Sequence, residues 1–232
     1  MSSEGDPILG HLRAVAAERE AQGRDPALAA RVVAVKKFQH QRFESTYADM
    51  LAHGRYGRAA RFFLDDLYGP HDFSERDDQF ARIVPALVRL FPAEIVQTVA
   101  LLAELHALSE TLDAAMARNL PDASVTWANY GVAWRAVGRP QDRERQIELL
   151  LQVGLALDRL TRRALLRHSL RLMRGPAQAA GLGSLQRFLE TGFDTFREMN
   201  GAQGFLDTIA TRERQLAARL FSAAEAAGAP NL

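Results

Sequence analysis

Two histidine–glutamate pairs have the spacing of ligands that share one helix face. His40 precedes Glu44 by four residues, and His106 precedes Glu110 by four. On an α-helix this spacing directs an imidazole and a carboxylate to the same side, as metal sites in helical bundles require. The di-iron pattern of such bundles instead places His three residues after Glu, and no Glu-x-x-His occurs in the chain. We therefore predict no metal site and treat these four residues as weak candidates only.

Cofactor and nucleophile patterns are equally sparse. His40, His106 and His168 each fall on a predicted helix, so haem ligation is an alternative, but a lone histidine beside apolar residues more often belongs to the core. The chain has no cysteine, no G-x-S-x-G elbow and no phosphate-binding glycine loop. We predict no cofactor, and the sequence does not decide whether the protein is an enzyme.

A row of arginines forms a basic face on one predicted helix. Arginines recur at spacings of four, four and three, with leucines on the opposite side of the helix: Arg163, Arg167, Arg171 and Arg174. Such a face suits an acidic partner or phosphate groups. Arginines also accumulate near helix C-termini because they interact favourably with the helix dipole. We expect a solvated face, whose replacement by glutamine changes stability by only a few tenths of a kcal/mol.

The segment 61–85, RFFLDDLYGPHDFSERDDQFARIVP, combines aromatic and charged residues around a turn. Gly69-Pro70 predicts a sharp stop that folds the next helix back beside the preceding one. Asp77 follows Ser74 by three residues, which predicts a capping box at the start of that helix. We expect Arg76 or Arg82 to reach an acid of the preceding helix. The candidate binding residues at this helix corner, 61–82, are Phe62, Phe63, Asp66, Tyr68, Arg76 and Asp77.

The heptapeptide within this segment, residues 62–68, resembles the bacterial family named for its FFLEELY motif. Two aspartates, Asp65 and Asp66, stand where that motif has glutamates. The following GP-x-DF-x-x-RD run is also similar to the family. The resemblance implies no activity, cofactor or catalytic residue, because the family is uncharacterised.

Helical periodicity dominates the elements that must position these residues. Apolar residues recur at three- and four-residue spacing, and no Val/Ile/Thr run alternates between turn residues. We predict an all-α single domain over 1–232, frayed at 1–5 and 228–232, with about eight to nine helices. A helix over 93–119 is apolar nearly all round, which predicts a central position. Helices over 26–53 and 141–174 are expected to pack along it.

Composition narrows the classes of partner. The chain has 232 residues with 29 Lys+Arg and 28 Asp+Glu, so its net charge is +1 and no overall field attracts nucleic acid. No uninterrupted apolar stretch is long enough to span a bilayer. We expect a soluble cytoplasmic protein that binds another protein or a second copy of itself, with no specific nucleic acid.

Two functions remain open from the sequence. The first is a non-catalytic binding or interaction module, a class that includes regulatory proteins, which uses the helix corner. The second is a small-molecule or cofactor binding protein, or an enzyme, with an apolar pocket inside the bundle. An enclosed cavity would favour the second if aromatic side chains line it, the candidates being Phe62, Phe63, Trp127, Trp134 and Phe188. An exposed apolar patch at the corner would favour the first.

Overall fold

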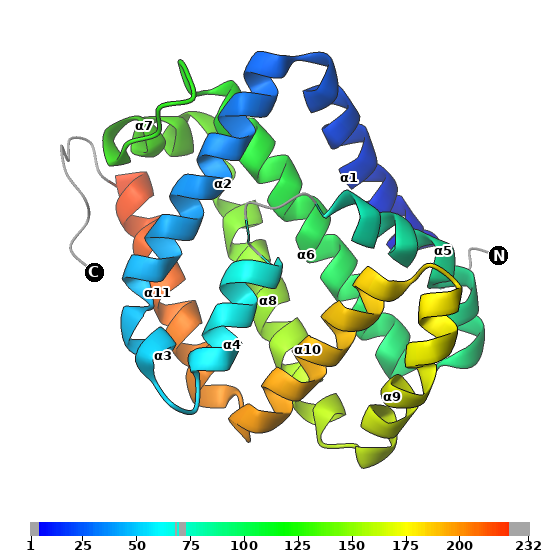
Figure 1. Ribbon diagram of the computed structural model, residues 1–232. Helices are drawn as coiled ribbons and strands as arrows, with labels where there is room; N and C mark the ends of the chain where they lie inside the picture. Colours follow the sequence, from blue (N-terminus) through cyan, green and yellow to red (C-terminus); the bar gives the residue numbers. More distant parts are fainter. Residues whose placement is uncertain (1–4, 68, 70–72, 223–232) are drawn as a thin grey trace.

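The structure, a computed structural model, describes residues 5–67, 69 and 73–222. Within these ranges the backbone forms eleven α-helices, one π-helical turn and no strand, as Figure 1 shows. The all-α prediction is confirmed, whereas the expected eight to nine helices are too few. The ends predicted to fray, 1–5 and 228–232, lie outside the described residues except for Gly5, and Tyr68 lies outside them as well. No described helix is long and apolar enough to cross a membrane.

The first half of the chain contains more breaks than its periodicity predicts. Asp25 begins one helix by accepting hydrogen bonds from the amides of Ala27 and Leu28, at 3.0 and 3.1 Å. The helix predicted over 26–53 stops at Thr46, because Tyr47 leaves helical geometry and its hydroxyl donates to Glu213 at 2.7 Å. The elements here are α1 (Asp6–Arg24), α2 (Pro26–Thr46), α3 (Ala48–Ala52), α4 (Gly57–Phe62), the π-helical turn η1 (Phe63–Leu67) and α5 (Ser74–Leu90).

The second half contains one further unpredicted break. The helix expected over 141–174 is interrupted because Arg163 is extended, and its guanidinium pairs with Glu94 at 2.6 Å. Asn200 in the left-handed region and Gly201 at φ 110° turn one helix into the next. The elements are α6 (Ala93–Arg118), α7 (Trp127–Val137), α8 (Pro140–Thr161), α9 (Ala164–Ala179), α10 (Gly183–Met199) and α11 (Gln203–Ser222).

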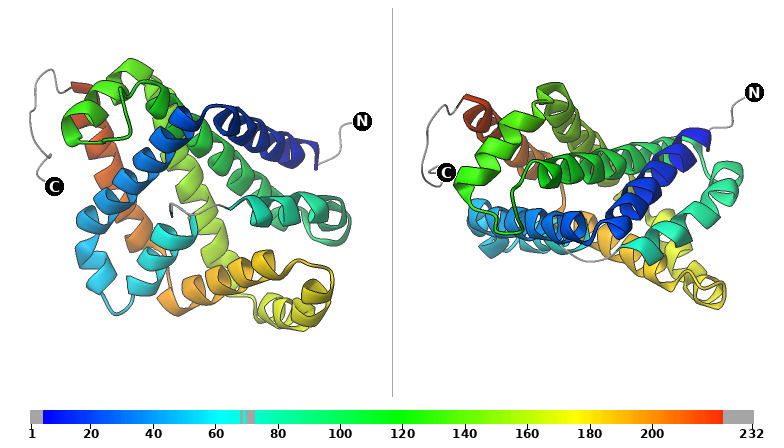
Figure 2. Two further views of the ribbon diagram at one scale, coloured as in Figure 1. Left: turned by 45° about the horizontal axis from the view of Figure 1, so that its top comes forward. Right: turned by 90° about the horizontal axis from the view of Figure 1, so that it is seen from above.

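Helix α6 runs through the middle of the molecule, as predicted for 93–119 (Figures 1 and 2). It contributes to three apolar clusters. Val96 and Ala103 pack with α1 and α5, and Leu105 joins the cluster built by α3, α4, α8, α10 and α11. Met116 belongs to a third cluster, with α2, α7 and α11. The predicted packing of α2 and α8 along α6 is confirmed, and α1 also lies against it.

Two helix glycines mark close helix–helix approaches. A Cβ atom at Gly192 of α10 would lie 2.9 Å from Cζ of Phe62, and one at Gly154 of α8 would lie 2.5 Å from a methyl of Leu206. Larger side chains at these positions would force the neighbours apart. Gly192 therefore lets Phe62, the last residue of α4 and the first of the FFLDDLY motif, seat directly against α10.

Candidate functional site

The aromatic residues of the helix corner are part of the core. Phe62, Phe63 and Leu64 are all buried. The ring of Phe62 stacks on Phe188 with centroids 5.5 Å apart, and Phe63 packs edge-on against Phe205 at 5.4 Å. Because these side chains anchor α4 and η1 to α10 and α11, they offer no apolar patch to a partner.

Two charged residues of the corner, Arg76 and Asp77, turn inward, and Asp77 does not act as predicted. Asp77 does not cap α5, whose first turn begins after Phe73 without a side-chain cap. Its carboxylate instead contacts His106 Nε2 of α6 at 2.7 Å and Arg19 Nη2 of α1 at 2.9 Å. Charged partners on other helices satisfy this carboxylate better than the amides of its own helix.

Arg76 reaches the preceding segment as expected. Its Nη1 donates to the carbonyl oxygen of Asp66 at 2.7 Å, and its Nε lies 3.6 Å from Asp77. The guanidinium also lies 4.1 Å from the ring centre of Phe73 and 4.6 Å from that of Phe188. These ring and hydrogen-bond contacts fix the plane of the guanidinium. The predicted role of the Tyr68 ring falls outside the described residues.

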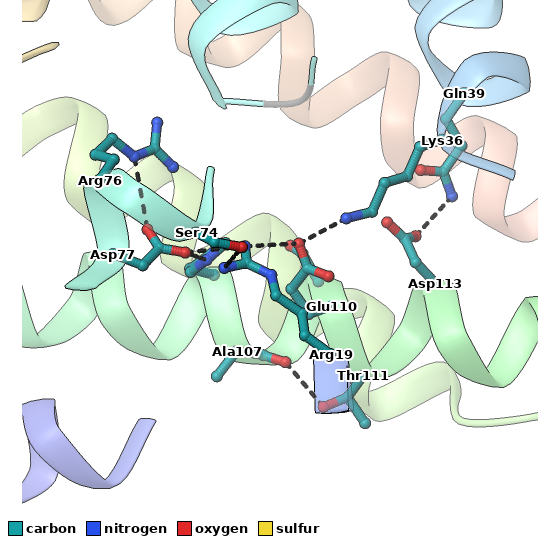
Figure 3. Close-up of polar contacts among 12 residues, drawn as sticks. Arg19, Lys36, Gln39, Ser74, Arg76, Asp77, Ala107, Glu110, Thr111 and Asp113 are labelled. Atoms are coloured by element: carbon teal, nitrogen blue, oxygen red, sulfur yellow. Dashed lines mark hydrogen bonds and ion pairs between the residues drawn. The ribbon is translucent and has the colours of Figure 1, made fainter. Parts of the chain in front are cut away.

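The ion pairs continue along one side of α6, as Figure 3 shows. Glu110 lies one turn beyond His106, 2.7 Å from Lys36 of α2 and 3.7 Å from Arg19. Arg19 thus links Asp77 to Glu110. We call this set, Arg19, Lys36, Arg76, Asp77, His106 and Glu110, the pocket network.

Burial and charge act in opposite directions on Asp77. Burial alone would raise the pKa of this carboxyl, but the hydrogen bond and charge of His106, followed by the charges of Arg76 and Arg19, outweigh it and lower the pKa below 3.8. Burial lowers the pKa of Arg76, against the attraction of Asp77. Asp77 is therefore ionised at neutral pH, and the Arg76 guanidinium is a cation held in poorly hydrated surroundings.

A cavity of about 80 Å³ adjoins the pocket network, between α1, α5, α6 and α10. Its walls are largely apolar, and its polar residues include the hydrogen-bonded pair of Asp77 and His106. The lining residues are Leu12, Arg76, Asp77, Phe80, Val99, Leu102, Ala103, Leu105, His106, Ser109, Leu185, Phe188 and Leu189. Apolar walls with a few convergent polar groups are the usual composition of a small-molecule site.

Of the five aromatic residues proposed to line a cavity, Phe188 is the one that lines the cavity beside Arg76. Phe62 stacks behind Phe188, and Phe63 lines a separate apolar hollow of about 20 Å³. Trp127 and Trp134 pack in the core at the far end of α6, with Tyr130 between them. The aromatic residues therefore divide between two ends of the bundle.

The metal candidates are brought into separate polar contacts. His40 lies 3.4 Å from Asp65 and 3.9 Å from Glu44, and His106 contacts Asp77. Glu110 faces cationic side chains instead of a second imidazole. Among the described residues, no group of three or more histidine and carboxylate side chains is arranged to hold a metal ion.

Three of the four basic-face arginines form ion pairs with other helices. Arg163 pairs with Glu94, Arg167 with Asp194 at 2.9 Å and Arg174 with Glu190 at 2.7 Å. The last two pairs join α9 to α10. These arginines are thus part of the contact between neighbouring helices as well as of the surface.

A second polar group lies deeper in the bundle, about one turn further along α6 than Glu110. Gln39 Nε2 donates to Asp113 at 2.9 Å and to the Tyr130 hydroxyl at 3.3 Å. Arg143 stacks 3.9 Å from the ring centre of Trp134. Burial raises the pKa of Asp113 and lowers that of Arg143. The charge of Arg42 also acts on Tyr130. We call this set, Gln39, Arg42, Asp113, Tyr130 and Arg143, the enclosed cluster.

Sequence reasoning did not identify Arg19, Lys36, Ser109 or the enclosed cluster as parts of sites. The available signal was a polar residue on an apolar helix face, such as His106 within IVQTVALLAELHAL. That signal does not show which residues will contact the polar side chains of α6, because their partners come from α1, α2 and α5.

Comparison with known proteins identifies the family and nothing narrower. No curated protein and no solved structure matches the chain. A family model described as a domain of unknown function (DUF8198) matches residues 18–227. This match covers most of the chain, including α2 to α11 with both polar groups, and the protein therefore belongs to that family.

Proposed function

We propose that the protein binds a small organic acid in the cavity between α1, α5, α6 and α10. The observation that carries the proposal is that an apolar cavity adjoins a buried guanidinium, that of Arg76. The apolar part of the ligand would lie against residues such as Val99, Ala103 and Leu189. Its carboxylate would pair with Arg76, beside His106.

The charge balance of the pocket network favours an anion. Its side chains include three permanent cations, Arg19, Lys36 and Arg76, and two carboxylates, Asp77 and Glu110. Within this set one positive charge is in excess before any charge on His106 is counted, and the charge of Asp66 also acts on Arg76 from outside the set. A ligand carboxylate would neutralise this excess positive charge in a region where water only partly hydrates it.

Arg76 has the geometry to receive that carboxylate. A guanidinium has five N–H donors in a planar fork. The contacts with Asp66 and Asp77 engage Nη1 and Nε, and the rings of Phe73 and Phe188 hold the plane. Such preorganisation reduces the entropy lost when a ligand binds.

The size of the cavity limits the ligand. Its volume of about 80 Å³ is roughly half that of an engineered apolar cavity, about 150 Å³, that holds benzene. A chain of about three or four carbons therefore fits without moving side chains. Butyrate is the appropriate first probe, with its amide as a neutral control of the same shape.

A pocket explains the corner better than a docking surface for another protein does. Phe62 and Phe63 are buried, so an interaction module would have to recognise its partner through the charged rim of the corner. The same rim residue, Arg76, faces the cavity. We therefore treat binding of a small acid as the principal proposal.

Thermal shift and calorimetry with butyrate, octanoate and butyramide test the proposal. A ligand of the folded chain raises Tm, and we expect butyrate to do so at millimolar concentration while butyramide does not. Arg76→Gln removes the cation, and Ala103→Leu fills the cavity. Each variant should weaken butyrate binding by at least about tenfold, or roughly 1.4 kcal/mol.

Arg82→Gln is the matched control, because Arg82 lies on the same helix and donates to the Gly181 carbonyl away from the cavity. It should leave butyrate binding unchanged. Equal binding of acid and amide, or no binding by any probe acid, would show the proposal to be wrong.

We also propose that the chain is a bacterial, cytoplasmic member of the FFLEELY-motif proteins. The support is the motif at 62–68, with aspartates at two of its positions, together with the GP-x-DF-x-x-RD run that follows it. Fractionation of cells that express the protein tests its location. A search for the motif among other DUF8198 chains tests the ancestry.

A further inference from the structure

The positive charge of this nearly neutral chain is concentrated around α9. Between Asp158 and Glu190 the sequence contains no acidic residue and seven arginines: Arg159, Arg162, Arg163, Arg167, Arg171, Arg174 and Arg187. The carboxylates paired with this segment are Asp158, Glu94, Asp194 and Glu190. Seven cations therefore face four paired anions, which leaves a local surplus of three positive charges.

Helix α9 also exposes an apolar face. Leu165, Leu172 and Met173 are 76, 65 and 52% exposed, and their spacings of seven and eight residues place them on one side of the helix. Leu166 and Leu170, on the side nearer α10, are half-buried. Figure 2 shows the α9–α10 hairpin at the edge of the molecule, with its outer side uncovered.

Two of the other four exposed large apolar residues lie at the same end. Leu90 and Phe91 close α5, and Glu94 of the next helix pairs with Arg163 just before α9. Among the described residues, the remaining exposed large apolar side chains are Val33 and Val132, on α2 and α7. The exposed apolar surface is thus concentrated where the positive charge is in surplus.

We propose that α9 binds the surface of an anionic lipid bilayer. The helix would lie in the plane of the interface, with Leu165, Leu172 and Met173 reaching below the headgroups. Arg171 lies on the arginine side of the helix, near Glu190 and Asp194, and its charge would add to the attraction of the surplus arginines for anionic headgroups. A basic helix with a separate exposed apolar face is typical of interfacial helices, and surplus arginines near the surface add attraction to anionic lipid.

A lipid surface fits this face better than nucleic acid does. Single-stranded nucleic acid is bound by aromatic platforms between basic residues, and the exposed row on α9 consists of leucine and methionine. Aliphatic side chains gain free energy by leaving water for an apolar layer, which nucleic acid does not provide. The proposal is independent of the cavity, which α9 does not line.

Sedimentation of the full chain with vesicles tests the proposal. We expect binding to vesicles of phosphatidylcholine with phosphatidylglycerol, weak binding to phosphatidylcholine alone, and a loss of binding as salt is raised. The double variant Leu172→Ser/Met173→Ser should bind anionic vesicles at least about tenfold more weakly. Arg171→Gln should weaken binding less and reduce its salt dependence.

Val132→Ser is the matched control, because Val132 is 57% exposed but lies on α7. It should bind vesicles like the unchanged protein, and so should Ala103→Leu, whose altered cavity separates this test from that of the proposed function. Circular dichroism checks that the exposed substitutions leave the fold intact.

Several results would overturn the proposal. The first is that the protein does not bind anionic vesicles. The second is that it binds anionic and neutral vesicles equally, and the third is that the double variant binds as well as the unchanged protein. A dimer in light scattering that the double variant converts to monomer would assign this face to a second copy of the chain. A gel shift with single-stranded RNA in the absence of vesicle binding would assign it to nucleic acid.

Discussion

The pocket network and the enclosed cluster hold two carboxylates, Asp77 of α5 and Asp113 of α6, in opposite electrostatic states. Asp77 meets His106, Arg19 and Arg76, and its pKa is lowered despite burial. Asp113 receives a hydrogen bond from the neutral Gln39, and burial raises its pKa. Burial and charge both contribute to the difference. Asp113 is the more deeply buried, and the charges of Lys36 and Arg143 do not offset that burial, whereas His106 bonds directly to Asp77.

The two regions also differ in what surrounds them. The pocket network borders a cavity of about 80 Å³, whereas Tyr130 and Trp134 pack over the enclosed cluster. A buried charge beside a cavity is accessible to a ligand. A buried charge under packed aromatic rings contributes to the arrangement of helices, and we assign these two roles to the two regions.

The largest effect is expected from Arg42→Met in the enclosed cluster. Arg42 and Tyr47 both bond to Glu213, so removing the guanidinium leaves a nearly buried carboxylate without its cation. We expect the free energy of unfolding in urea to fall by about 3–5 kcal/mol. The control Arg58→Met breaks an exposed pair with Glu198 and should cost less than about 1 kcal/mol. Equal losses for the two variants would contradict the assignment.

Asp77→Asn should have an intermediate effect that depends on pH. Because its pKa is lowered by folding, Asp77 stabilises the folded chain fully at a pH above its pKa in the unfolded chain. That contribution is lost as the pH falls through the pKa of Asp77 in the folded chain. We expect a loss of about 1–3 kcal/mol at neutral pH, which shrinks in acid below the ordinary value of 3.8. Asp78→Asn, at the exposed neighbouring position, should change little. A loss that does not depend on pH would refute the ionic role of Asp77.

Asp113→Asn should act in the opposite direction. Because burial raises its pKa, ionised Asp113 lowers stability at a pH above its pKa in the folded chain. At a pH below its pKa in the unfolded chain, Asp113 is protonated in both states and the cost vanishes. The amide retains an acceptor for Gln39 and removes the desolvation cost. At neutral pH we expect a stability unchanged or increased by up to about 1 kcal/mol, with the gap closing in acid. A clear loss in urea unfolding would mean that the charge of Asp113 is needed.

The smallest effect is expected at the surface. Arg163→Gln breaks the pair with Glu94, in which both side chains are partly exposed. Solvent screening limits such pairs to about 0–1 kcal/mol, and we expect a decrease near the lower end that disappears in high salt. A loss as large as that of Asp77→Asn would show that the extended conformation of Arg163 is needed to hold α8 and α9 apart.

Local rules were sufficient where a few adjacent residues control the backbone. Asp25 with Pro26 predicted the start of α2, and the apolar stretch over 93–119 predicted both the length and the central position of α6. Hydrophobic periodicity determines which face of a helix is buried, because burial of apolar area is the main favourable term in folding. The sequence therefore determined the all-α class and much of the core.

Only the tertiary structure decided where long helices stop and which charges meet. Tyr47 and Arg163 lie where predicted helices are interrupted, and their side chains bond to Glu213 and Glu94, which are far away in the sequence. By local rules Asp77 should cap its own helix, yet it contacts His106 and Arg19 on two others. An ion pair between residues far apart in the sequence forms only if the packing of whole helices brings them together. Helical periodicity describes one helix at a time and does not predict that packing. The cavity beside Arg76 has the same origin, since it is bounded by four helices at once.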